Sequence, residues 1–132
     1  MHINWLAVVA AAVSTFLIGG LWYSKALFGR PWMSVNNLSD AELSKSNMPK
    51  IFGLSLLFAL LMAANLAAFL AEPKTTASWG ATAGFLAGFG WVTLGIATIS
   101  LFERRSWKYV AINGGYMTVS FVVMGLIIGA WR

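Results

Sequence analysis

Residues 109–130 decide the fold of this chain, and they read YVAINGGYMTVSFVVMGLIIGA. The run contains no Asp, Glu, Lys or Arg and is dominated by apolar side chains. A bilayer core about 30 Å thick needs roughly 20 apolar residues of helix at 1.5 Å per residue. This stretch is long enough, and we expect it to form a transmembrane helix.

Three further stretches of similar length and composition precede it, at residues 3–23, 51–71 and 79–102. Lipid offers no partners to backbone N–H and C=O groups, so each span is expected to be helical. The runs also lack the alternation of polar and apolar residues that marks barrel strands. The sequence therefore predicts an all-α, integral membrane four-helix bundle, with residues 1–132 forming a single transmembrane domain.

The composition excludes other classes of protein. The chain is 59% hydrophobic and only 10% charged, so it has too few charges to cover a water-facing globule. The same balance excludes disorder, and the absence of Cys excludes a disulfide scaffold. The first span has no Lys or Arg before it and is longer than a signal-peptide core, so we expect it to be retained.

The basic residues predict an orientation, because positively charged loops stay in the cytoplasm. The second loop has only Lys74 and the C-terminus only Arg132. The first and third loops hold the other seven Lys and Arg: Lys25, Arg30, Lys45, Lys50, Arg104, Arg105 and Lys108. We therefore expect a multi-pass protein of the plasma (inner) membrane with loop 24–50 cytoplasmic and both termini outside. Its partner would be the lipid bilayer, not nucleic acid, because no soluble basic module is present.

Loop 24–50 is the one polar segment long enough to fold by itself. Ser39 followed by Glu42 matches a capping box, which predicts a short interfacial helix over residues 40–46. Pro49 is expected to end this helix, while Gly29 and Pro31 are expected to form a turn at the membrane surface. The loop is either a solvated connector or a lid or docking element for a partner.

Small residues recur every four positions in the spans, which places them on one helix face. Gly80, Gly84 and Gly88 form such a stripe in the third span, with Gly95 expected near the same face. The second span has another stripe, which includes Ala59, Ala63 and Ala67. Such stripes allow membrane helices to pack closely, either within the bundle or against a second copy. We expect both packing inside the chain and a homo-oligomer, or assembly with another membrane protein.

Titratable groups that would support catalysis or metal binding are scarce. The only His is His2, and the four acids lie outside the apolar runs. We therefore expect no enzyme activity, no catalytic residues, no metal and no cofactor. The amides of Asn65 and Asn113 are expected to bond between helices or to line a cavity. A candidate polar cluster, where a small ligand or lipid headgroup would meet the protein, comprises Trp22, Tyr23, Ser100, Asn113 and Tyr116.

Two motifs resemble a known family. The sequence GGLWYS at residues 19–24, followed by LFG at 27–29 and Trp32, is similar to the N-terminal signature of small bacterial membrane proteins catalogued as domain of unknown function 1761. NGGY at residues 113–116 and the run 125–131 resemble the C-terminal signature. The resemblance implies a four-helix bacterial inner-membrane protein and implies no activity. Small multidrug-resistance transporters are similar only in length and span number, because their first span carries an acid that residues 3–23 lack.

Two functions are consistent with these features. The first is a non-enzymatic assembly or interaction protein that self-associates through small-residue helix faces. The alternative is a passive channel or an uncoupled transporter of small solutes. An intramembrane acid of the kind that couples transport to protons is missing from the apolar runs.

Overall fold

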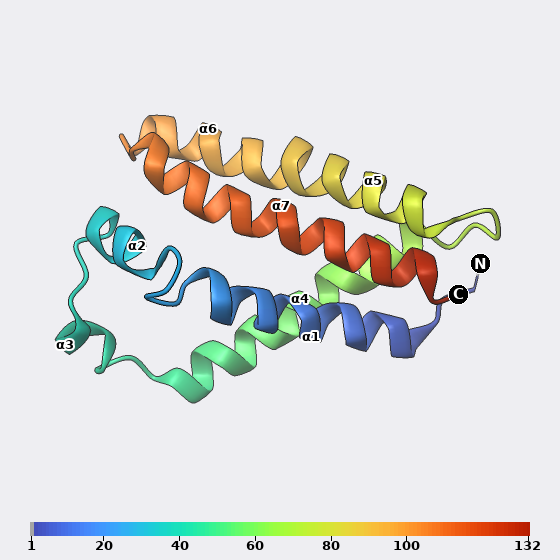
Figure 1. The fold of residues 1–132 in the computed structure, drawn as a ribbon, viewed down its shortest axis with the longest axis horizontal. Helices are drawn as coiled ribbons and strands as arrows, with labels where there is room; N and C mark the ends of the chain where they lie inside the picture. Colours follow the sequence, from blue (N-terminus) through green and yellow to red (C-terminus); the bar gives the residue numbers. More distant parts are fainter. Residues whose placement is uncertain (1) are drawn as a thin grey trace.

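The computed structural model describes residues 2–132, which are helical with short connections and contain no strand. Four helical segments are long and apolar enough to cross a membrane, which confirms the predicted all-α architecture and indicates a multi-pass membrane protein (Figure 1). The third segment is continuous but is divided by a π-helix into α5 (Ala77–Ala87), η1 (Gly88–Thr93) and α6 (Leu94–Phe102). The other three are α1 (Trp5–Trp22), α4 (Met48–Phe69) and α7 (Trp107–Ala130).

Each long segment begins directly after a polar residue whose side chain accepts a backbone N–H of the first turn. These residues are Asn4, Asn47, Thr76 and Ser106. Such caps satisfy donors that would otherwise have no partner in the helix. α4 therefore starts before its apolar run, and Pro49 lies in its first turn, where a missing N–H is tolerated. The expectation that Pro49 ends the preceding loop helix was wrong.

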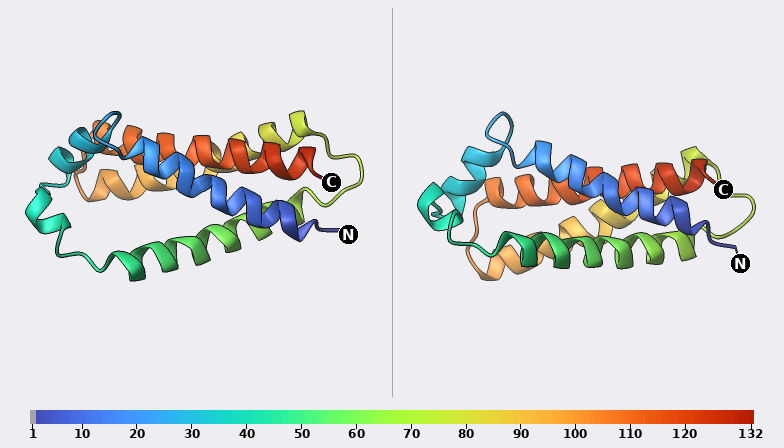
Figure 2. Two further views of the ribbon diagram at one scale, coloured as in Figure 1. Left: turned by 60° about the horizontal axis from the view of Figure 1, so that its bottom comes forward. Right: turned by 90° about the horizontal axis from the view of Figure 1, so that it is seen from below.

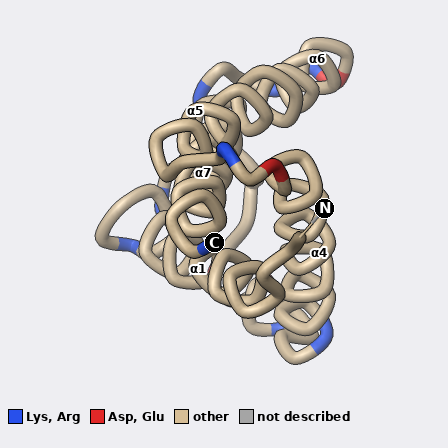
Figure 3. Tube along the Cα trace, turned by 90° about the vertical axis from the view of Figure 1, so that its right-hand side faces the viewer, with Lys and Arg blue, Asp and Glu red and all other residues tan. Residues whose placement is uncertain are grey.

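Helix α7 is the centre of the bundle. It lies between the α5–η1 segment and α1, while α4 packs mainly against α1 (Figure 3). The central layer is filled by small side chains and one flexible one, because Ala11, Ala12, Ala63 and Met124 are completely buried. Methionine suits such a position because its unbranched chain fills irregular gaps between helices.

The glycine stripe of the third segment faces α7 of the same chain. A Cβ on Gly80 or Gly84 would collide with the backbone carbonyl of Gly125 or Phe121, and one on Gly88 would lie 2.7 Å from the Cβ of Phe121. The two backbones therefore approach as closely as helices can, which maximises dispersion contacts in lipid. The alanine stripe is also internal, since Ala59, Ala63 and Ala67 all belong to the buried core.

The π-helix changes which residues continue the glycine stripe. An α-helix would place Gly95, two turns after Gly88, on the same face. One extra residue in η1 rotates the following helix, so Thr93 faces α7 instead and donates to the carbonyl of Gly114 at 2.8 Å. A Cβ on Gly95 would meet nothing within 4 Å. The expectation for Gly95 was therefore wrong, because sequence spacing assumes 3.6 residues per turn throughout.

The two ends of the bundle differ in charge. Both termini and residues 70–76 lie at one end, which we call the termini end (Figure 1). The opposite end, which we call the basic end, carries loop 23–47 and the α6–α7 connection. Its basic residues are Lys25, Arg30, Lys45, Lys50, Arg104, Arg105 and Lys108.

Two short helices lie in the first loop at the basic end (Figure 2). α3 (Asp40–Leu43) is capped by Ser39, which accepts the N–H of Glu42 at 3.2 Å, as the sequence predicted. α2 (Gly29–Val35) was not predicted, and the expected turn at Gly29 and Pro31 was wrong. Both residues lie in the first turn of α2, which a proline tolerates. Gly29 is required by space, since a Cβ there would lie 2.8 Å from the carbonyl of Ser24.

Candidate functional site

The C-terminal end of α1 is fastened to α7 by an aromatic and polar cluster at the basic end. The indole Nε1 of Trp22 donates to the carbonyl oxygen of Ile112 at 2.8 Å. The hydroxyl of Tyr23 donates to Oδ1 of Asn113 at 2.7 Å. The sequence placed these side chains at similar depth, and the structure brings them into direct contact.

Tyr116 extends this cluster toward the middle of the bundle. Its hydroxyl donates to the carbonyl oxygen of Thr15 at 3.1 Å, and its ring meets that of Tyr23 edge to face at 5.3 Å between centroids. The Thr15 carbonyl belongs to helix α1, so the contact joins two spans about two turns away from Tyr23. Hydrogen bonds between membrane helices are worth on the order of 1 kcal/mol each.

The same cluster holds helix α2 against the bundle. The ring of Trp32 contacts Tyr23 at 5.6 Å, and that of Phe28 contacts Trp22 at 4.8 Å. Gly115 leaves room for the Trp22 ring, because a Cβ there would lie 2.8 Å from it. Neither Trp32 nor Thr15 was predicted to belong to the cluster. Trp32 does belong to the quoted N-terminal motif, whereas Thr15 takes part through its backbone and leaves no signal in the sequence.

Two residues that the sequence singled out lie elsewhere. Ser100 is buried on α6 and lines an open cavity at the α6–α7 connection, apart from the tyrosines. Asn65 is exposed on α4, and its Nδ2 donates to the carbonyl of Leu61 in the same helix at 2.9 Å. The expected interhelical bond is thus formed by Asn113 and not by Asn65.

The cluster holds α1 and α2 against α7, and we call it the clamp. Both tyrosine hydroxyls and the Trp22 indole are engaged with protein acceptors. Among residues 2–132, no group of three or more His, Cys, Asp or Glu side chains is close enough to hold a metal ion. The arrangement can fix the angles between α1, α2 and α7. Its hydroxyl and indole groups therefore stabilise the bundle.

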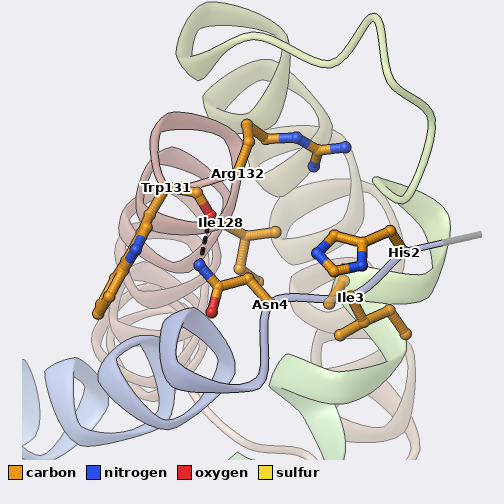
Figure 4. Close-up of a pocket in the computed structure, with 7 residues that line it drawn as sticks. His2, Ile3, Asn4, Ile128, Trp131 and Arg132 are labelled. Atoms are coloured by element: carbon orange, nitrogen blue, oxygen red, sulfur yellow. Dashed lines mark hydrogen bonds between the residues drawn. The ribbon is translucent and has the colours of Figure 1, made fainter.

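A second set of polar contacts joins three helix ends at the termini end (Figure 4). Asn4 caps α1 and also donates from Nδ2 to the carbonyl of Trp131 at 3.3 Å. Arg132 donates to the carbonyls of Leu70 and Glu72 at 2.6 Å each, beyond the end of α4.

The cavity beside these contacts has a volume of about 20 Å³. His2, Asn4 and Arg132 line it (Figure 4). A space of this size holds about one water molecule. It is therefore too small for a solute and fits a bridging water between the polar ends of the helices.

Comparison with known proteins identifies the family of the chain but assigns no activity to it. The chain matches the model of the family described as "Protein of unknown function (DUF1761)" over residues 6–129. No curated protein and no solved structure matches the chain significantly. The matched range covers the four spans except for the first residue of α1 and the last of α7. It includes Trp22 and Tyr23 and the glycine contacts between α5 and α7. The chain therefore belongs to the family of domain of unknown function 1761.

Proposed function

We propose that this protein is a non-enzymatic component of the plasma membrane, with both termini outside, that acts by assembling with a second copy of itself. The non-enzymatic part of the proposal is supported by where its few reactive groups lie. Its single histidine is at the termini end. Its acids all lie outside the four long segments, at Asp40, Glu42, Glu72 and Glu103.

The face used for assembly is not one of the small-residue stripes. Those stripes are occupied by contacts inside the chain, as described for Gly84 and Ala63. Helix α4 instead has an outward face whose members follow one another at spacings of three and four residues. This face consists of Leu54, Phe58, Leu61, Asn65 and Ala68, all of them exposed.

The observation that carries the proposal is the amide of Asn65 on this apolar face. Its one hydrogen bond stays within its own helix, and its side chain is exposed within the apolar α4 segment. An amide in hydrocarbon gains from a polar partner on another helix. A two-fold dimer whose axis passes close to Asn65 supplies such a partner, because a residue at the axis faces its own copy.

Cysteine crosslinking in proteoliposomes tests this interface directly, because the chain has no native Cys. We expect Leu61→Cys to form an intermolecular disulfide, while Leu17→Cys and Leu101→Cys, which are at least as exposed, remain monomeric. Crosslinking at Leu17 or Leu101 in place of Leu61 would assign the interface to another face. Crosslinking at none of the three positions would reject self-association.

A matched pair of substitutions then tests the role of the amide. Asn65→Leu should weaken dimerisation about five- to ten-fold, corresponding to about 1 kcal/mol for an interhelical amide contact. Thr98→Val removes another exposed polar group that bonds only within its own helix, on α6, and should leave dimerisation unchanged. Equal effects of the two substitutions would show that Asn65 has no special part.

The alternative, a passive channel or uncoupled transporter, finds less support in this arrangement. The central layer of one chain is occupied by side chains that are completely buried, namely Ala11, Ala12, Ala63 and Met124. A path for solutes would therefore have to form between copies. Flux of ions and small polar solutes into liposomes that contain wild-type protein, lost with Asn65→Leu, would favour that function.

A further inference from the structure

A second cavity lies at the basic end, where α6 turns into α7, and it is unlike the water-sized space at the termini. Its volume is about 220 Å³, which is room for several waters at about 30 Å³ each. Two arginines, Arg104 and Arg105, line it together with the buried Ser100 and the indole of Trp107. The remaining wall is apolar, formed by Ala97, Leu101 and Val110.

From this lining we infer that the α6–α7 cavity binds the phosphate of an anionic phospholipid. Arginine guanidinium groups match phosphate oxygens with paired N–H donors, and two arginines line this opening. The hydroxyl of Ser100 adds a neutral donor from the inner wall. The positive charge of the two arginines thus complements the negative charge of a phosphate group.

The backbone of the connection holds the arginines at the opening. The N–H of Arg105 donates to the carbonyl of Ser100 at 2.9 Å and that of Arg104 to Leu101 at 3.4 Å. This is the Schellman pattern at a helix end, in which the left-handed residue is usually glycine. Here that residue is Arg104, with φ of 59°. An arginine side chain therefore stands where local geometry alone would favour glycine.

The neighbouring groups leave the guanidinium of Arg105 available to a ligand. Its Nε lies 3.9 Å from the carboxylate of Glu103, and its central carbon Cζ lies over the ring of Tyr109, 4.9 Å from the ring centroid. The contact with Glu103 is long and engages Nε, so the two η nitrogens remain for other acceptors. The cation–π contact with Tyr109 restrains the position of the group and lowers the entropy lost on binding.

The apolar wall distinguishes a lipid from a free phosphate ion. Trp107 begins α7 and lies at the level where indole rings favour the membrane interface. A lipid phosphate at the arginines would place its glycerol and first acyl carbons against Leu101, Ala97 and Val110. A free phosphate would leave those side chains without a partner. The first N–H groups of α7 add positive potential at the same place.

Lipid retention measured by native mass spectrometry tests this site, with purified protein in a neutral detergent. We expect wild-type protein to retain one phosphatidylglycerol in preference to phosphatidylcholine. The variant Arg104→Gly with Arg105→Ala should bind phosphatidylglycerol at least about ten-fold more weakly. Glycine is the favoured residue at position 104, so this variant keeps the turn, which thermal unfolding in detergent verifies.

The matched control, Lys50→Ala with Lys108→Ala, also removes two positive charges from the basic end, but neither residue lines the cavity. This control should change phosphatidylglycerol retention by less than about two-fold. An equal loss of phosphatidylglycerol in both variants would show that only the general positive potential of the basic end attracts the lipid. That result would overturn the site. Equal retention of phosphatidylcholine would also overturn it. Displacement of the lipid by millimolar inorganic phosphate would assign the cavity to a soluble ligand and reject the lipid.

Discussion

The backbone of Gly84 on α5 lies against the carbonyl of Phe121 on α7, so closely that a Cβ on the glycine would collide with that oxygen. This contact is one of a series, since a Cβ on Gly80 would collide with the carbonyl of Gly125 and one on Gly88 would lie 2.7 Å from the Cβ of Phe121. Hydrophobic burial adds little to helix association inside lipid, so the close approach itself stabilises the pair. The stability of the α5–α7 hairpin therefore depends on glycine having no side chain at these positions.

Substituting Gly84 by Ala should destabilise the protein by about 1–3 kcal/mol, because the overpacked backbone must move apart. Gly95→Ala is the matched control, since a Cβ at that position meets nothing within 4 Å. The control should leave stability unchanged or raise it by a few tenths of a kcal/mol through better helix propensity. Thermal unfolding in detergent measures both. Equal destabilisation by the two substitutions would contradict the packing described here.

The Tyr23–Asn113 hydrogen bond should be measurable as a coupling between two substitutions. Tyr23→Phe and Asn113→Ala should each destabilise the protein, and the double variant should lose less than the sum, with a coupling of about 0.6–1.7 kcal/mol. Asn65→Ala, which removes an amide bonded within its own helix, should show no coupling to Tyr23→Phe. A coupling near zero for Tyr23 and Asn113 would mean that the clamp contributes packing alone.

Deleting one residue from the π-helix should be tolerated. Removal of Gly90 would turn the five-residue spacing between Gly88 and Thr93 into the four of an α-helix, with both residues still facing α7. Removal of Gly95 should disrupt the hairpin, because it rotates the buried Ser100 by about 100° away from α7. Expression level and melting temperature compare the two. Equal tolerance would show that the register after Thr93 is unimportant.

Asn4 at the termini end should stabilise the protein in two ways that can be separated, through the α1 cap and through the bond to Trp131. Asn4→Ala removes both the α1 cap and the bond to Trp131, and should reduce stability by about 1 kcal/mol. Asn4→Ser keeps a capping oxygen but is too short to reach Trp131, so it should have a smaller effect. Urea or SDS unfolding distinguishes them. If serine were as harmful as alanine, the cap would not be the principal contribution.

The charge difference between the ends predicts the orientation in the membrane. Reporter fusions at residue 132 should report an outside location, and a reporter inserted in loop 24–50 should report the cytoplasm. Replacing Arg104, Arg105 and Lys108 together by Gln should weaken this preference and give a mixed orientation. An inside C-terminus in the wild-type protein would reverse the assignment of the two ends.

The sequence by itself determined that the chain forms four helices long and apolar enough to cross a membrane. Helices form wherever a long apolar run must satisfy its own backbone in lipid, and this requirement depends on composition and length alone. The Ser39 cap of α3 was likewise readable, because a capping bond spans three residues. The quoted N-terminal motif also marked Trp22, Tyr23 and Trp32, although not what they contact.

Tertiary structure decided which faces meet. The period of 3.6 residues placed Gly80, Gly84 and Gly88 on one face but could not say whether α7 or a second copy would cover it. The extra residue of η1 then placed Thr93, and not Gly95, on that face. No local sequence pattern predicts such a π-turn. Contacts between distant residues, such as Tyr116 with the Thr15 carbonyl or Arg132 with Leu70, depend on helix angle and depth. These are set by the sum of many packing contacts, which no local pattern encodes.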